Sequence, residues 1–381
     1  MTPAERYLLL GLRLGRHVDG IVDSYYGPAE LKEQADREEP VPPEVLAAEG
    51  DALLAELDDG WLRDLVRGAA TYAHVLAGEP IPYADEVEAC FGVRPRRIDP
   101  EVYAETHARL EELLPGEGPL GERRQAWREQ NRVPEDKLLP VLRDVLADLR
   151  ARTQDLFGLP DGEEIELDAV DDEPWWAFNY YQGGLRSRVV VNVDVPTTFD
   201  DVLELAAHEG YPGHHTERST KEVELVRRRG ALEETLNLVP TPQSLVAEGI
   251  AETAVEVLGD DAREAFVEIL RVHGIEYDVE HALAVREALR PIRGVGLDAA
   301  LLLHEDGASV DEVVDFVVRN GATTEERARH NVRFALDPTW RAYAVCYSAG
   351  GELARAYHRN DPARFARLLR EHVRVPELLA S

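Results

Sequence analysis

Three histidines and a glutamate crowd into one short segment of this 381-residue sequence. They are His208, Glu209, His214 and His215, in the run Leu205-Ala-Ala-His-Glu-Gly-Tyr-Pro-Gly-His-His-Thr-Glu217. Imidazole nitrogens and carboxylate oxygens bind zinc, and in the zinc-protease helix His-Glu-x-x-His the glutamate lies beside the metal-bound water. The segment therefore predicts one divalent ion, Zn²⁺, with His208 as a ligand and Glu209 as the catalytic general base.

The spacing of the second histidine departs from that helix. Pro212 occupies the position four residues after His208, and it can neither bind a metal nor donate a helical hydrogen bond. An undistorted helix would point His214 about 240° away from His208 and would place His215 roughly 10 Å further along the axis. Because proline and glycine favour local unwinding, we expect Pro212 and Gly213 to open a bulge that returns one histidine to the site. We favour His214, with His215 as its alternative, over a solvated helix surface that binds no ion.

A later segment offers two carboxylates one helical turn apart. Glu248 and Glu252 lie in a helix predicted to begin at Thr241-Pro242, within an otherwise small and apolar stretch. Zinc needs a third protein ligand and keeps its fourth position for water, and ligating histidines usually donate their other N–H to a carboxylate. We predict Glu248 as the ligand and Glu252 as the acceptor that orients a histidine ring. Glu252 could instead be the ligand and Glu248 the orienting acceptor. The competing interpretation is that both glutamates belong to an ordinary acidic helix surface that binds no ion.

Two further side chains could donate a hydrogen bond to the oxyanion of a reacting carbonyl. The first choice is Tyr347 and the second is His304. Tyr347 could instead be a core tyrosine, and His304 lies on an apolar helix, where a structural role is more common. A thiol nucleophile at Cys346 is disfavoured, because its neighbours Val345 and Tyr347 include no base.

The elements that must position these residues are mainly helical. Residues 4–157 show apolar spacings of three and four, interrupted by proline and glycine, and the chain is again helical from residue 198 onward. An extended pattern is confined to about residues 165–195, with a hairpin turn predicted at Gln182-Gly183-Gly184. The sequence therefore predicts a mainly α fold with one small antiparallel or mixed β-sheet directly before the metal-binding helix.

We divide the chain into two parts that form one integrated domain. Residues 1–160 are predicted to be a helical N-terminal scaffold or cap packed on the rest of the chain. Residues 161–381 are predicted to be the catalytic region. Within that region, the small sheet occupies residues 161–196 and the metal-site helices occupy residues 198–381.

The predicted sheet suggests how a substrate could bind. Its last strand ends in Asn192-Val-Asp-Val-Pro196, just before the metal helix, and a proline fits an edge strand or a strand end. If this strand is an exposed edge, an extended peptide could pair with its backbone. The aromatic residues between Trp175 and Tyr181 could wall the cleft, although core packing is the commoner role for such a run.

Composition excludes several classes of partner. The formal net charge of −32 disfavours nucleic acid, which requires a concentrated basic face. Two cysteines, Cys90 and Cys346, cannot build a disulfide framework or a thiolate metal site. The apolar run near the N-terminus is too short for a signal peptide or a membrane span. We therefore predict a soluble, cytoplasmic protein with neither nucleic acid nor a membrane as partner.

Three separated segments resemble the signatures of a known family. They are His208-Glu-Gly-Tyr-Pro-Gly-His-His215, Glu248-Gly-Ile-Ala251 and Tyr347-Ser-Ala-Gly350. In type and order they are similar to the His-Glu-x-x-Pro-Gly-His-His, Glu-Gly-Trp-Ala and Tyr-x-x-Gly signatures of the bacterial domain-of-unknown-function 885 family. The segments Asp172–Tyr181 and Tyr25–Leu31 resemble one branch of that family, so the likeness extends over nearly the whole chain.

The resemblance implies a gluzincin-type zinc metallopeptidase: a multi-helical metallopeptidase-like fold whose small sheet has an edge strand along the substrate cleft. By position it implies His208, His214 and Glu248 as ligands, Glu209 as base and Tyr347 as a transition-state donor. The preferred function is thus a zinc-dependent hydrolase of peptides or small amides, acting through metal-activated water. The alternatives are a metal-dependent esterase or non-peptide amidase, and a non-catalytic metal- or peptide-binding protein.

Overall fold

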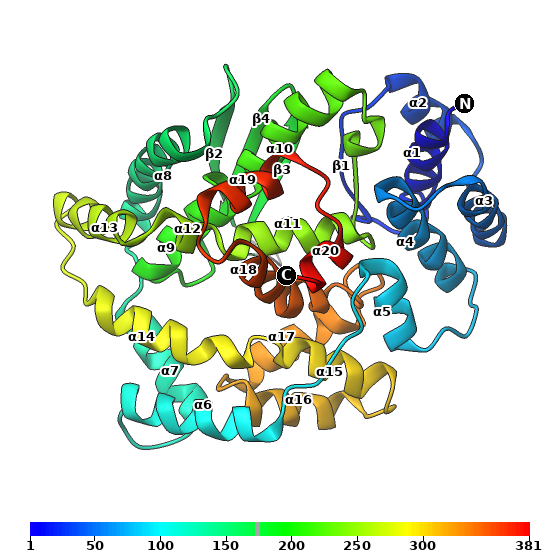
Figure 1. Cartoon of the computed structure of the whole chain (residues 1–381). Helices are drawn as coiled ribbons and strands as arrows, with labels where there is room; N and C mark the ends of the chain where they lie inside the picture. The colour runs from blue at the N-terminus through cyan, green and yellow to red at the C-terminus, as the bar shows by residue number, and fades with distance from the viewer. Residues whose placement is uncertain (172–175) are drawn as a thin grey trace.

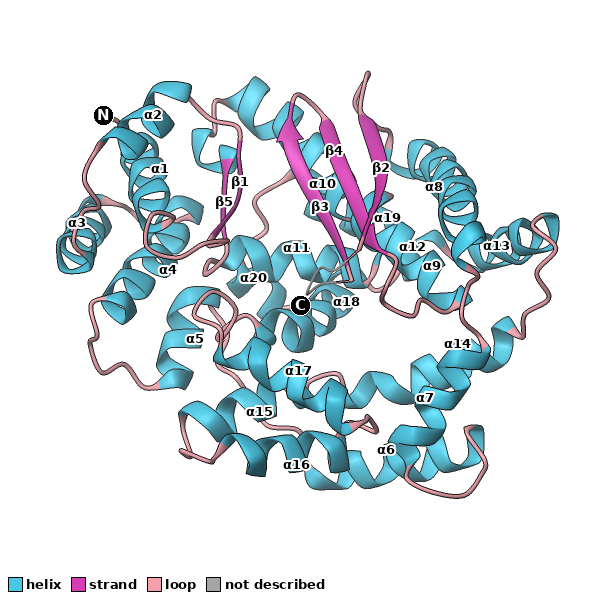
Figure 2. Ribbon diagram, turned by 180° about the vertical axis from the view of Figure 1, so that it is seen from behind, coloured by secondary structure: helices cyan, strands magenta, loops and turns pink. Residues whose placement is uncertain are grey.

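The computed structural model describes residues 1–171 and 176–381 and is mainly helical (Figures 1 and 2). The aromatic run and the family-like segment predicted from Trp175 and Asp172 onward therefore begin outside the described residues. The first part of the chain forms helices α1 (Pro3–Leu14), α2 (Ala29–Arg37), α3 (Pro43–Glu56), α4 (Trp61–Leu76), α5 (Tyr83–Phe91), α6 (Pro100–Leu113), α7 (Leu120–Gln130) and α8 (Glu135–Phe157).

Helix α1 illustrates how local sequence sets these elements. Thr2 and Glu5 form a capping box at its start, and Pro3 occupies the first turn, where a missing N–H costs nothing. Its apolar face, which includes Tyr7 and Leu14, is fully buried. The helix therefore begins where the capping signal predicts and is held in place by core packing.

The later part of the chain is also helical, with several short π and 3₁₀ segments, labelled η. Helices α9 to α12 and their neighbours are α9 (Phe199–Leu205), η1 (Ala206–Gly210), α10 (His214–Lys221), η2 (Glu222–Arg227), η3 (Leu232–Thr235), α11 (Pro242–Glu252) and α12 (Ala254–Leu258). The remainder are α13 (Asp260–Val272), α14 (Val279–Leu289), η4 (Arg290–Ile292), α15 (Val295–His304), α16 (Val310–Asn320), α17 (Glu325–Leu336), η5 (Cys346–Gly350), α18 (Gly351–His358), α19 (Pro362–Arg370) and α20 (Val375–Leu379).

The predicted sheet is present and mixed. Its strands are β2 (Glu164–Val170), β3 (Ala177–Gly183) and β4 (Arg186–Asn192), in the order β2-β4-β3. Strand β4 pairs in parallel with β2 and antiparallel with β3. The hairpin predicted at Gln182-Gly183-Gly184 is confirmed, and Gly183 and Gly184 have φ angles of +74° and +64°, a region that favours glycine.

The structure corrects two expectations about the strands. The strand that ends at Asn192 is β4, which is central in its sheet and does not offer the exposed edge considered for it, because the edge strands are β2 and β3. A second sheet pairs β1 (Val22–Tyr25) with β5 (Leu236–Leu238), whereas the sequence predicted a single one. Strands of four and three residues are too short to show a period of two, and their pairing depends on contacts across more than half the chain.

Helix α11 runs through the middle of the molecule, and α6, α7 and α14 to α17 form a layer beneath it (Figure 1). The largest apolar core joins α1, α4, α5, α11 and the C-terminal helices, with Leu245 and Ile250 of α11 inside it. A second core joins α8, α9, α13 and η1, and includes Ala206 and Ala207. The two segments expected to carry the metal site are thus held by different cores.

Across the described ranges, no helix combines the length and apolar character needed to span a lipid bilayer.

Candidate metal centre

The segment before the first histidine is a well-capped helix that changes its winding. The backbone N–H of Thr198 donates to the Asp201 carboxylate over 3.0 Å at the start of α9. Helix α9 then continues into the π-helix η1, which carries His208 and Glu209. A π turn is wider than an α turn and often occurs at functional sites. The ring of His208 is therefore placed by an interrupted helix, as the sequence predicted.

A tight turn returns the chain to this site. The Gly213 N–H donates to the carbonyl of Ala207 over 2.9 Å, and α10 then begins at His214. A Cβ atom on Gly213 would lie 2.0 Å from the carbonyl oxygen of His208, a distance that no side chain can adopt. Glycine at this position is therefore required by the close approach of two backbone segments.

His208, His214 and Glu248 converge. The rings of the two histidines are 4.7 Å apart and nearly perpendicular. His208 Nε2 lies 3.5 Å from Glu248 Oε2, and His214 Nε2 lies 3.5 Å from Glu248 Oε1. One potential ligand atom from each residue lies within 4.8 Å of the other two. The bulge and the neighbouring helix α11 together bring these three side chains to one point.

The donor set fits a tetrahedral zinc ion. Ligand atoms about 2.0–2.1 Å from zinc lie about 3.3–3.5 Å from one another at tetrahedral angles, close to the two measured N–O distances. Among the described residues, Glu248 Oε2 and His214 Nδ1 are buried without a hydrogen-bond partner. A buried carboxylate oxygen without a partner is costly, and a bound cation would satisfy it.

The electrostatics of the site also favour a cation. Burial opposes both charges, yet contact with His214 and the charge of His208 lower the pKa of Glu248 to about 2. Burial likewise opposes a charge on His214, but its contact with Glu248 raises the pKa of His214 to about 9. In the metal-free chain a proton on His214 thus supplies the positive charge that Glu248 requires.

Glu252 lies on the other side of the His208 ring. Its Oε1 is 4.0 Å from His208 Nδ1, beyond direct hydrogen-bond distance, and its second oxygen forms an ion pair with Arg293. Glu248 therefore approaches Nε2 of His208, while Glu252 faces Nδ1. The two glutamates thus face different nitrogens of the ring, but at 4.0 Å Glu252 does not accept the hydrogen bond by which a carboxylate would orient it.

A cavity of about 100 Å³ opens beside the three converging residues, and Glu209 and Tyr347 line it. Tyr347 as a residue is 41% exposed and lines the cavity, so a bound molecule can reach it. Desolvation and the charges of Glu248 and Glu209 raise the pKa of Tyr347 well above its usual value, so its hydroxyl stays protonated at neutral pH. Tyr347 can therefore act as a hydrogen-bond donor in this cavity.

Sequence reasoning missed Tyr343. Its hydroxyl donates to Glu248 Oε1 over 2.7 Å, and its ring packs at 5.4 Å against the ring of Tyr347. Tyr343 lies just before η5 and Tyr347 lies within it, four residues later, a spacing that would place both side chains on one face of a continuous helix. That spacing was the available signal, but the sequence did not indicate that this face would meet Glu248.

Two predicted residues lie away from the cavity. His215 is fully buried, with Nδ1 2.8 Å from Ser187 Oγ and Nε2 2.8 Å from Glu163 Oε2, so both ring nitrogens are engaged in a structural link to the sheet. His304 Nε2 contacts the carbonyl of Ala335 at 2.8 Å. The His304 ring stacks on Tyr83, and His304 is not among the described residues that line the cavity.

The strand beside the cavity is β3, not the end of β4. Ala177 and Asn179 of β3 line the cavity, and the Asn179 side-chain amide donates to the carbonyl of Glu209 over 2.6 Å. Of the aromatic residues predicted either to wall the cleft or to pack in the core, Phe178 lines the cavity. Tyr181 is buried, and its hydroxyl donates to Glu222 over 2.6 Å. An edge strand therefore lies along the cavity, as the family resemblance implies. That strand is β3, whereas the sequence pointed to the strand that ends at Asn192, which is β4.

Comparison with known proteins leaves the function open and shows the fold. No protein-family model matches the chain, and no curated protein matches its sequence. Among solved structures it is similar to the "putative lipoprotein from Colwellia psychrerythraea", with a TM-score of 0.53 and 15% sequence identity. The likeness covers 88% of this chain and 61% of that protein, so this chain spans about three fifths of its neighbour's length. At this identity the similarity shows that the two share a fold.

Proposed function

We propose that this chain is a zinc-dependent hydrolase that cleaves amide bonds in peptides. The observation that carries the proposal is the convergence of His208, His214 and Glu248 on one point beside a cavity lined by Glu209 and Tyr347. Three protein ligands and an adjacent carboxylate are the donor set of a catalytic zinc site, whereas a structural site uses four protein ligands. Among the described residues, no fourth histidine, cysteine or carboxylate joins this group.

Each residue at the proposed centre has a distinct role in amide hydrolysis. When bound, a zinc ion lowers the pKa of a coordinated water to about 7 and polarises the substrate carbonyl. Glu209 accepts a proton from the attacking water and returns it to the leaving amine. The Tyr347 hydroxyl donates to the carbonyl oxygen as negative charge develops on it. Tyr343 holds Glu248 in place through its 2.7 Å hydrogen bond.

A peptide substrate suits the surroundings of the cavity. Strand β3 is at the edge of its sheet and contributes Ala177 and Asn179 to the cavity wall. An extended peptide can align with such an edge through its backbone, which places a scissile amide beside Glu209. Both cysteines are buried and free, in keeping with the cytoplasmic location that we propose for the reaction.

The decisive experiment combines metal analysis with one conservative substitution. The purified chain should contain about one zinc per molecule and should cleave members of a peptide library read by mass spectrometry. Glu209→Gln should keep the zinc but lower the rate of cleavage by about a hundredfold or more. Glu224→Gln, at a residue of η2 that pairs with Arg228, is the matched control and should cleave at the normal rate.

Two results would contradict the proposal: a purified protein without a stoichiometric transition metal, or undiminished cleavage by Glu209→Gln. A parallel screen of esters and non-peptide amides separates a peptidase from the related hydrolases. Zinc retention without turnover of any of these substrates would support a non-catalytic metal-binding protein instead.

A further inference from the structure

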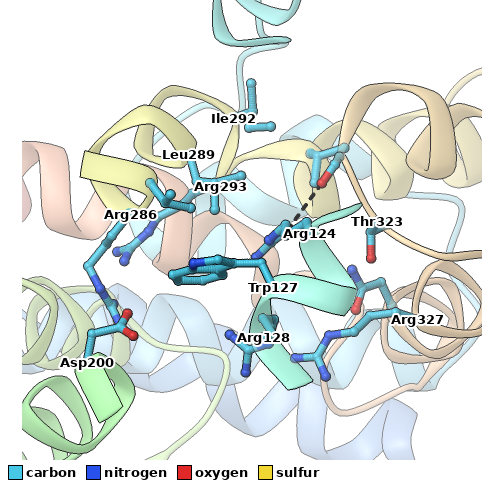
Figure 3. A pocket seen from close by; sticks show the side chains of 14 residues that line it. Arg124, Trp127, Arg128, Asp200, Arg286, Leu289, Ile292, Arg293, Thr323 and Arg327 are labelled. Carbon is cyan, nitrogen blue, oxygen red and sulfur yellow. Dashed lines mark hydrogen bonds and ion pairs between the residues drawn. The ribbon is translucent and has the colours of Figure 1, made fainter. Parts of the chain in front are cut away.

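A second cavity, of about 260 Å³, lies among α7, α14, α15 and α17 and shares no described lining residue with the cavity at the metal centre (Figure 3). Its wall is strongly basic, although the whole chain has 42 basic against 74 acidic residues. Among the described residues, one carboxylate, that of Asp200, lines this cavity. Five arginines line the same cavity, which we call the arginine pocket: Arg124, Arg128, Arg286, Arg293 and Arg327.

Three of the five guanidinium groups are paired with carboxylates. Arg128 forms a 2.9 Å ion pair with Asp201. Arg286 lies 3.1 Å from carboxylate oxygens of both Asp200 and Asp201. Arg293 pairs with Glu252. These arginines are positioned by the protein itself, and their charges are largely compensated.

The other two arginines have no such compensation. Within the described ranges Arg124 has no carboxylate partner and reaches only the carbonyl oxygens of Gly321 and Ala322, at 3.5 and 3.4 Å. The guanidinium group of Arg327 forms no hydrogen bond or ion pair with any described residue, although Arg327 lines the same cavity; its backbone N–H donates to Thr324 Oγ1 at the start of α17. Burial, followed by the charges of Arg128 and Arg327, lowers the pKa of Arg124 to about 10. Two positive charges without a contacting carboxylate among the described residues therefore face one small cavity and repel each other.

An apolar wall completes the cavity. The indole of Trp127 lies among the guanidinium groups of Arg124, Arg128 and Arg286, and Leu289 and Ile292 line the same space (Figure 3). A guanidinium group presents a planar fork of donors that matches phosphate and carboxylate oxygens. The aromatic and aliphatic side chains suit a flat or apolar body rather than a bare inorganic ion.

We propose that the arginine pocket binds a small organic anion that carries a phosphate group, or a pair of carboxylates, on an apolar body. Two negative charges balance Arg124 and Arg327, while Trp127 packs against the body of the ligand. A volume near 260 Å³ is slightly below the usual range of ligand pockets, about 300–1,000 Å³, which favours a single-ring molecule over a dinucleotide. The site is separate from the proposed hydrolytic centre, and its occupancy requires no turnover.

Calorimetric titration of the 381-residue chain tests the proposal directly. The probes are phenyl phosphate, phthalate, inorganic phosphate and uncharged phenol. We expect saturable binding of phenyl phosphate or of phthalate. Tighter binding of phenyl phosphate identifies the charged group of the ligand as a phosphate, and tighter binding of phthalate identifies it as a pair of carboxylates. Inorganic phosphate should bind more weakly, and phenol should not bind.

Matched arginine variants locate the binding. Arg124→Gln and Arg327→Gln should each weaken binding of the tighter probe by about tenfold or more, because each removes a charge-assisted contact. Arg329→Gln is the control, since Arg329 lies on the same helix but pairs with Asp311 and Glu325 at the surface. Its affinity should match that of the unmodified chain.

Thermal unfolding without any added anion separates a binding role from a structural one. Because Arg327 repels its neighbours, Arg327→Gln should leave the Tm unchanged or raise it, whereas loss of a structural arginine would lower it. The proposal is overturned if neither organic anion binds, if phenol binds as tightly, or if Arg124→Gln and Arg327→Gln bind like Arg329→Gln. These outcomes do not depend on zinc or on hydrolysis, so they are independent of the proposed function.

Discussion

The hydroxyl of Tyr343 donates a 2.7 Å hydrogen bond to the same Glu248 oxygen that lies 3.5 Å from His214 Nε2. This contact joins the segment before η5 to α11. The two elements can approach closely because Gly249 and Gly350 meet there, and a Cβ on Gly249 would lie 2.6 Å from the Gly350 carbonyl oxygen. Tyr343 therefore orients the carboxylate that we propose as a metal ligand.

Tyr343→Phe should weaken zinc binding by about tenfold, because outer partners of metal ligands typically contribute ten- to hundredfold to affinity. Competition with a chromogenic chelator measures the change. Tyr83→Phe is the matched control, since Tyr83 is also buried but donates to the carbonyl of Arg341, over 2.6 Å. Equal zinc affinities for the two variants would show that the Tyr343 hydroxyl does not support the site.

Tyr347→Phe should lower kcat by about ten- to a thousandfold while leaving KM and zinc affinity nearly unchanged. The hydroxyl lines the cavity but forms no hydrogen bond with any described residue, so its loss removes a contact made only to the reacting carbonyl. Steady-state kinetics on a cleaved library peptide provide both constants. A rise in KM at constant kcat would instead assign Tyr347 to ground-state binding.

Gly213→Ala should disrupt the turn between the two histidines. The added methyl group would lie 2.0 Å from the His208 carbonyl and 2.3 Å from that of Ala207, so the backbone must shift. We expect a loss of about 2–3 kcal/mol in the free energy of unfolding and zinc binding weakened by at least about tenfold.

Gly296→Ala is the control for that substitution. Gly296 lies in α15, and a Cβ there meets no atom within 4 Å. Alanine is the better helix former by about 1 kcal/mol, so this variant should be as stable as the unmodified chain or more stable. Chemical denaturation of both variants, with zinc titration, tests the comparison. Normal zinc affinity in Gly213→Ala would mean that the turn does not position His214.

Acid stability should depend on Glu234, which is buried between α1, α4 and the C-terminal segment. Burial alone would raise the pKa of this carboxyl, but contact with His372 at 2.8 Å, the Lys221 charge and a 2.8 Å hydrogen bond from Trp61 lower it to about 2. A carboxyl whose pKa is depressed by folding stabilises the protein above its unfolded pKa, about 4.3. That stabilisation is lost progressively as the pH falls from about 5 towards 2.

The Tm of the unmodified chain should therefore fall steeply over this acid range, and that of Glu234→Gln should fall less steeply. Glu44→Gln, at an exposed residue of α3, should behave like the unmodified chain. Differential scanning calorimetry at several pH values measures the slopes. Parallel curves for the unmodified chain and Glu234→Gln would exclude Glu234 as a main acid-sensitive group.

Local signals were sufficient for much of the fold and for the first half of the site. The helical periods predicted a mainly α structure, and the glycine pair at 183 and 184 predicted the hairpin, because both features depend on residues close in sequence. The Pro212-Gly213 pair indicated an interrupted helix for the same reason. Residue types also identified His208, Glu209 and Glu248 as candidates, since few side chains bind zinc or transfer protons.

Long-range packing was needed for the rest. The histidine at 214 turns towards Glu248 because Gly213 docks on the Ala207 carbonyl, while His215 is held by Ser187 and Glu163 from the sheet. Strand β4 is central because β2, which is not its neighbour in the chain, pairs with it in parallel. The contact between Tyr343 and Glu248 and the lining of the arginine pocket both join elements that are far apart in the chain. The direction that the chain takes after a turn depends on side-chain packing between elements, and so does the choice of which faces pair. The spacing of residues along a single helix or strand does not encode that packing.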